Sequence, residues 1–159
     1  MIEEDTDWSP DEDVAFTRYG IDVPHDKATS SEIFLINPNG RGKPRRLTNN
    51  DDEELGPARS PDGKQLAFMC RAGGTAFQAC VMNVDGSGLR DVTSGRSVSW
   101  SPDGKTLIFH RTVEHDDTED EQLFSVDLSG SNEQQLTSGG WSNGWANPGL
   151  LRTQSPYRE

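Results

Sequence analysis

The stretch from Trp100 to Arg111 has the sequence WSPDGKTLIFHR, and most of it occurs earlier as SPDGKQLAFMCR at Ser60 to Arg71. A looser copy, WSPDEDVAFTR, occupies Trp8 to Arg18. In both full copies a Ser-Pro-Asp-Gly turn precedes an apolar run, because proline presets φ, aspartate bonds its own backbone and glycine accepts a positive φ. We therefore expect structural turns, each leading into a buried strand, at Pro61, Asp62, Gly63, Pro102, Asp103 and Gly104.

A second turn follows each apolar run, and every copy closes on a Leu-Thr or Val-Thr pair. The second turn has the sequence NPNG, NVDG or DLSG, where a glycine such as Gly86 again relieves the backbone. A fourth, more polar strand is expected to end at Thr48, Thr93 or Thr137. Four short antiparallel strands in roughly 45 residues are typical of a propeller blade. The third strand of each copy is expected at Glu32–Asn37, Gln78–Asn83 and Gln122–Asp127.

The repeat predicts an all-β fold, a β-propeller or partial propeller of about three to four four-stranded antiparallel blades. The whole chain, 1–159, is expected to be one propeller-type domain, with repeats at about 5–48, 54–93 and 96–137 and a partial copy at 141–153. Propellers usually have about four blades or more, so three and a half blades leave open ends. A second copy in a homodimer, the remainder of a longer protein or rearranged terminal strands can close them, and we favour pairing or truncation.

The combination of SPDGK, an apolar strand, NVDGSG and the Leu-Thr ending resembles the PD40 or WD40-like β-propeller repeat of the TolB family. The same repeat occurs in propeller domains of prolyl-oligopeptidase-like peptidases. The resemblance covers Trp8 to about Thr153, with departures at Glu12 and Asp13 and in the shortened last copy, WANPGLL. It implies a repeat protein that works by protein binding at a propeller face, in a periplasmic or extracytoplasmic compartment.

The net charge of −12 excludes some partners. Nucleic acids and anionic membranes are polyanions, which this surface would repel. No stretch approaches the roughly 20 apolar residues of a membrane span, so no membrane insertion is expected. The start, MIEEDTDWSP, lacks the basic and apolar regions of a signal peptide, which fits either a cytosolic protein or a mature or trimmed chain.

We expect no catalytic residues and no enzyme activity. The P-loop, the Rossmann glycines and HExxH are missing. His110 follows Phe109 in an expected strand, and we interpret it as a structural histidine in a packed or channel-facing position. An accessory propeller of a larger enzyme, such as a prolyl-oligopeptidase-like peptidase, is the alternative.

Acidic and aromatic side chains in the variable loops are the candidate binding residues. The segment EHDDTEDE, from Glu114 to Glu121, is expected to be a solvated loop, and an acidic face suggests a basic segment of a protein as partner. Calcium is an alternative because carboxylates suit it, but the EF-hand spacing is missing, so no metal or cofactor is predicted. A small-molecule or carbohydrate binder is a third possibility. The candidate ligand- or partner-binding residues are Trp141, His115, Asp116, Asp117, Glu119, Asp120, Asp51 and Asp52.

Two further sets of residues are assigned structural roles. If a hairpin is centred on Thr75, Cys70 and Cys80 lie opposite each other, and a cross-strand disulfide is conceivable. Two small buried thiols are favoured over that disulfide.

Regularly placed tryptophans are expected to fill space between blades. Because the repeated turn is scaffold, function should lie where the copies differ. The tryptophans are Trp8, Trp100 and Trp145, and the differing segments are 22–30, 51–56, 73–77, 114–121 and the one around Trp141.

Overall fold

Every regular element in the described part of the chain is a β-strand. The computed structural model describes residues 2–7, 13–19, 31–39, 41–50, 52–71, 76–115 and 118–138. The prediction of an all-β fold is confirmed. The strands are β1 (Ile2–Asp7), β2 (Val14–Tyr19), β3 (Ser31–Ile36), β4 (Arg45–Arg46), β5 (Glu53–Arg59), β6 (Gln65–Arg71), β7 (Gln78–Asn83), β8 (Arg90–Ser94), β9 (Arg96–Trp100), β10 (Thr106–His115), β11 (Thr118–Asp127) and β12 (Gln134–Gln135).

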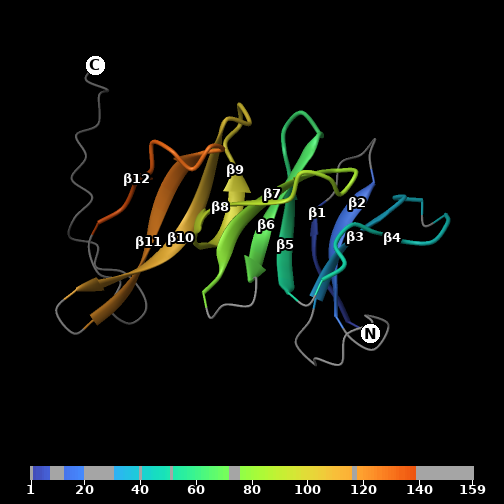
Figure 1. Ribbon diagram of the computed structural model, residues 1–159, viewed down its shortest axis with the longest axis horizontal. Helices are drawn as coiled ribbons and strands as arrows, with labels where there is room; N and C mark the ends of the chain where they lie inside the picture. Colours follow the sequence, from blue (N-terminus) through green and yellow to red (C-terminus); the bar gives the residue numbers. More distant parts are fainter. Residues whose placement is uncertain are drawn as a thin grey trace, which may run out of the picture.

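The strands form three antiparallel four-stranded units in chain order: β1–β4, β5–β8 and β9–β12. A single parallel contact, Ser31 with Glu53, joins β3 to β5 and merges the first two units into one eight-stranded sheet. Figure 1 shows the units side by side along the long axis. We call the edge that carries the turns at 60–64 and 101–105 the turn edge, and the opposite edge, where β8 leads into β9, the loop edge.

The two full Ser-Pro-Asp-Gly turns have the same hydrogen bonds. In the second unit the Gly63 amide donates to the Ser60 carbonyl at 2.9 Å, and the Asp62 carboxylate accepts from the Ser60 hydroxyl at 2.7 Å. In the third unit the Gly104 amide donates to the Ser101 carbonyl at 2.9 Å. Both glycines have positive φ, 74° and 68°, which glycine tolerates without strain. Residues 61–64 and 102–105 therefore form the same turn in the two units.

Two apolar clusters lie where neighbouring units face each other. One joins Ala15 and Ile33 of the first unit with Leu66 and Phe68 of the second. The other joins side chains of the second unit with those of the third, and Trp100 packs against it. The Trp100 indole N–H of the third unit also donates to the Ala58 carbonyl of the second at 2.9 Å. The predicted role of this tryptophan between units is confirmed, whereas Trp8 and Trp145 lie outside the described residues.

An arginine covers a pair of phenylalanine rings in the first and third units. The Arg18 guanidinium carbon lies 5.4 Å from the centroid of Phe16 and 4.6 Å from that of Phe34. The Arg111 guanidinium carbon lies 5.1 Å from the centroid of Phe109 and 4.9 Å from that of Phe124. The aligned positions of the second unit hold a disulfide between Cys70 and Cys80, with 5.9 Å between the Cα atoms. A covalent cross-link therefore takes the place of a cation–π stack.

The disulfide corrects two predictions. Cys70 faces Gln78 and Cys80 faces Phe68, so the cysteines are diagonal neighbours, and the pairing is shifted by two residues from that of a hairpin centred on Thr75. This register keeps Phe68 and Cys80 in the core together. Diagonal neighbours on one face of a sheet can still meet, and here the two sulfur atoms are bonded. The preference for two free thiols is therefore wrong.

The acidic segment 114–121 is mostly strand, which corrects the prediction of a loop. β10 and β11 stay paired as far as His115 and Thr118, because strand alternation lets the backbone ladder continue while Glu114, Glu119 and Glu121 remain exposed and Asp120 is buried. Near its base the Thr112 hydroxyl donates to the Glu121 carboxylate across the strands at 3.0 Å. The hairpin thus presents its carboxylates on a defined ladder.

Gly86 is expected to be less replaceable than Gly42. Both have positive φ, 92° and 87°, but a Cβ on Gly86 would lie 3.1 Å from the Leu47 carbonyl oxygen, whereas nothing lies within 4 Å at Gly42. We expect Gly86→Ala to lower the free energy of unfolding by about 1 kcal/mol more than Gly42→Ala, because only the first adds a clash to the backbone strain. Urea titration of both variants measures this difference. Equal losses would show that the contact between the units is unimportant.

Candidate functional site at the junction of the second and third units

Those predicted binding residues that the structure describes do not lie together in one site. Asp52 is half-buried just before β5 in one sheet, whereas Glu119 is exposed and Asp120 buried in β11 of the other sheet. The backbone of His115 ends β10. The other candidates lie outside the described residues: Asp51, Asp116, Asp117 and Trp141.

One group in the described ranges brings three potential metal ligands together. The sulfur atoms of Cys70 and Cys80 and a carboxylate oxygen of Asp91 lie within 4.8 Å of one another. The two sulfur atoms are bonded to each other, however, and a metal requires thiolates. The two cysteines are therefore interpreted as part of the core of the second unit, with Asp91 exposed at the surface.

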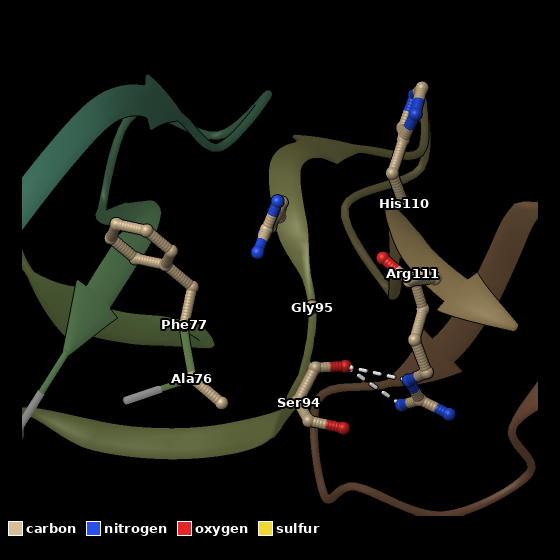
Figure 2. Close-up of a pocket in the computed structure, with 8 residues that line it drawn as sticks. Ala76, Phe77, Ser94, Gly95, His110 and Arg111 are labelled. Atoms are coloured by element: carbon tan, nitrogen blue, oxygen red, sulfur yellow. Dashed lines mark hydrogen bonds between the residues drawn. The ribbon is translucent and has the colours of Figure 1, made fainter. Parts of the chain in front are cut away.

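A pocket of about 310 Å³ opens where β8 leads into β9, at the loop edge. Figure 2 shows Gly95 between Phe77 on one side and His110 and Arg111 on the other. The apolar wall comes from the chain entering β7, and the polar wall comes from β10. The lining residues are Ala76, Phe77, Ser94, Gly95, Arg96, His110, Arg111 and Thr112.

Two potentially cationic side chains line the pocket from facing strands. Arg96 of β9 and His110 of β10 are direct cross-strand partners, so both side chains project from the same face of the sheet. The Arg96 guanidinium carbon lies 5.8 Å from the centroid of the Phe77 ring, and the Arg71 guanidinium carbon lies 4.9 Å from it. The pocket therefore combines an aromatic wall with a cluster of donors.

Arg111 is engaged within the protein. Its guanidinium donates to both carboxylate oxygens of Glu133, at 2.6 and 2.9 Å, and to the Ser94 carbonyl, at 2.8 Å (Figure 2 shows the bonds to Ser94). Hydrogen bonds from Arg111 lower the pKa of Glu133 below its ordinary value. Because Glu133 neutralises the charge of Arg111 and occupies its donors, we interpret Arg111 as a wall of the pocket and not as a binding group for a ligand.

The preceding junction, between the first and second units, is filled where this one is open. The two junctions can be aligned through a residue with positive φ that lies four places before each Ser-Pro turn. This residue is Gly56, at 61°, in the second unit and Ser97, at 50°, in the third. In this alignment Glu54 of the second unit corresponds to Gly95 of the third. Glu54 is 1% exposed, and burial raises its pKa to about 7. Its carboxylate accepts hydrogen bonds from Asn50 at 2.7 Å and from Thr48 at 3.1 Å.

The same alignment places Arg96 where the second unit has Leu55, and His110 where it has Met69. The open pocket thus arises from substitutions at otherwise structural positions. Segment 73–77 and His110 stand out in the sequence, but no local pattern connects them with Arg96. A comparison of the copies position by position is the signal that could have revealed the site.

Three aligned antiparallel units with apolar faces between them define a β-propeller protein, here in partial form. The chain belongs to the family described as TolB beta propeller domain, PD40, which matches residues 3–149. The described residues form strands and no helix, and so no helix long and apolar enough to cross a membrane.

Similar proteins include TolB proteins and peptidases. The chain is 41% identical over 66 residues to the Tol-Pal system protein TolB of Rhizorhabdus wittichii, a match that covers 40% of the chain and 15% of that protein. It is 41% identical over 54 residues to dipeptidyl-peptidase 5 of Porphyromonas gingivalis, covering 34% of the chain and 8% of the relative. The chain thus spans only a small part of the length of these relatives.

Solved structures agree on the fold. A putative TolB from Agrobacterium tumefaciens superimposes with a TM-score of 0.64 at 24% identity, over 82% of the chain and 47% of that structure. The β-propeller domain of the Trilobed protease from Pyrococcus furiosus superimposes with a TM-score of 0.57 at 20% identity, over 85% and 42%. Identities this low show a shared propeller fold alone.

Proposed function

We propose that the chain is a non-enzymatic, TolB-like propeller that binds a partner protein through its loop edge. The observation that carries the proposal is the pocket at the second junction, which is formed by residues that depart from the repeat. Loop faces of propellers are the usual places where ligands dock, because scaffold strands hold variable segments there. The similarity to TolB proteins, which are named as members of a Tol-Pal system, supports a role in a protein assembly.

The acidic hairpin of β10 and β11 is the second element of this surface. Glu114, Glu119 and Glu121 are exposed on it. A basic segment of the partner would be attracted to these carboxylates, and added salt would weaken that attraction. In this proposal the hairpin steers the partner and the pocket holds it.

The second candidate function is that of an accessory propeller in a larger enzyme. It is favoured by the match to dipeptidyl-peptidase 5 and by the likeness to a solved structure of puromycin hydrolase, which superimposes with a TM-score of 0.63 at 19% identity over 86% of the chain and 23% of that structure. In that case the loop edge would face a catalytic domain of the same polypeptide or assembly.

Photo-cross-linking from the two edges tests the proposed function. A photoreactive residue replaces Ala76 or Glu119 at the loop edge, and Lys105 at the turn edge is the matched exposed control. In cells that produce the protein, we expect a discrete protein adduct from the loop edge and none from Lys105. Mass spectrometry of the adduct separates a distinct partner, a catalytic domain and a second copy of this chain. Equal adducts from both edges, or none from either, would contradict the proposal.

A further inference from the structure

We propose that the pocket at the junction of the second and third units binds a carboxylate of the partner protein. Arg96 would hold the carboxylate, with His110 beside it and Phe77 as the apolar wall. This inference rests on the proposed function and names the chemistry of the contact. A glutamate or aspartate side chain and a free C-terminus offer the same group.

Arg96 is the cation of this pocket that lacks an acidic partner within the described part of the chain. Neighbouring Arg71 forms an ion pair with Glu53, and Arg111 forms one with Glu133. Arg96 stacks on the Phe77 ring, and the Arg96 side chain is exposed. A guanidinium stacked on an aromatic ring keeps its donor edge free for a bidentate contact with a carboxylate.

The placement of the donors favours an anion at this point. Arg96 and His110 are register partners on one face of β9 and β10, so both reach the same side of the pocket. In a chain with a net charge of −12, carboxylates are abundant, yet none in the described ranges closes this site. The pocket is thus locally positive although the molecule as a whole is negative. Only an anion that makes direct contact with Arg96 would therefore be attracted here.

The shape of the pocket fits a side chain or a chain end. Its volume of about 310 Å³ exceeds what a small inorganic anion needs, and Phe77 gives the carbon atoms of the bound group an apolar contact. Gly95 cannot carry a larger side chain here, because an added Cβ would lie 2.3 Å from the Phe109 ring. The pocket is therefore bounded by the buried core on one side and open to a ligand on the other.

The test titrates the isotope-labelled full chain with three pentaglycine-based peptides, each acetylated at its N-terminus, and follows backbone amide NMR shifts. Two peptides are amidated at the C-terminus and carry a central glutamate or a central glutamine, and the third is all glycine with a free C-terminus. We expect the amides of Gly95, Arg96 and His110 to shift with the glutamate peptide or with the free C-terminus, but not with the glutamine peptide. The peptide that binds identifies the source of the carboxylate.

Variants separate the pocket from general charge. Arg96→Ala should weaken binding of the active peptide by about tenfold or more, since a hydrogen-bonded ion pair is lost. Arg96→Lys should retain part of the affinity, and Lys105→Ala, which removes an exposed charge at the turn edge, should leave it unchanged. Unchanged affinity in Arg96→Ala, equal shifts with the glutamine peptide or no shifts with any peptide would overturn the inference. If loop-edge cross-links persist in that case, the proposed function stands without it.

Discussion

Replacing Glu54 with glutamine is expected to raise the free energy of unfolding by about 3 kcal/mol at pH 8 and to change it little at pH 4. Burial raises the pKa of Glu54 from 4.5 to about 7, so the folded protein keeps a proton that the unfolded chain releases. The stability of the wild-type protein therefore falls as pH rises between these two values. Glutamine cannot ionise and removes this dependence.

Urea titrations at several pH values measure the effect. Glu114→Gln is the matched control, because it removes one negative charge from an exposed position on β10. Its unfolding free energy should follow that of the wild-type protein at every pH. Parallel pH profiles for wild-type and Glu54→Gln would show that Glu54 is ionised without cost in the folded state, contrary to our interpretation of the first junction.

Reduction of the disulfide between Cys70 and Cys80 is expected to lower the free energy of unfolding by about 3 kcal/mol. The bond closes a short loop and so limits the freedom of the unfolded chain. It also stands where the first and third units have an arginine over two aromatic rings. Urea titration with and without reductant measures this loss.

The variant with both cysteines replaced by alanine is the control, because reductant should not alter its stability. Thiol alkylation of the unfolded wild-type protein without reductant should label neither cysteine. Labelling of both would mean that the protein carries two free thiols, as the sequence analysis preferred, and the expected loss on reduction would then not occur.

The propeller fold could be predicted from the repeat, because turn chemistry acts locally. The turns at Pro61 and Pro102 are set by adjacent residues, and the apolar runs that follow them can only be buried strands. Register was harder to predict. The placement of Cys80 opposite Phe68 and the extension of β10 to His115 depend on which side chains the core accepts, and no single segment contains that information.

The candidate site was largely hidden from sequence reasoning for a related reason. Arg96 lies fourteen positions before His110, and only the pairing of β9 with β10 brings them together. Acidic residues are numerous and therefore conspicuous in the sequence, but Asp52 precedes a strand of one sheet and Glu119 lies in a strand of the other. Gly95 indicates an open pocket only when it is compared with Glu54, which fills the aligned position of the first junction, and that comparison requires an alignment of the two junctions.

The most direct test of our central claim is amide hydrogen exchange of the full chain with and without the partner found by cross-linking. Binding through the loop edge predicts slower exchange at 76–77, 94–96 and 110–112, with the turns at 60–64 and 101–105 unchanged. Protection confined to those turns, or no protection at the pocket, would contradict the claim that the second junction is the binding site.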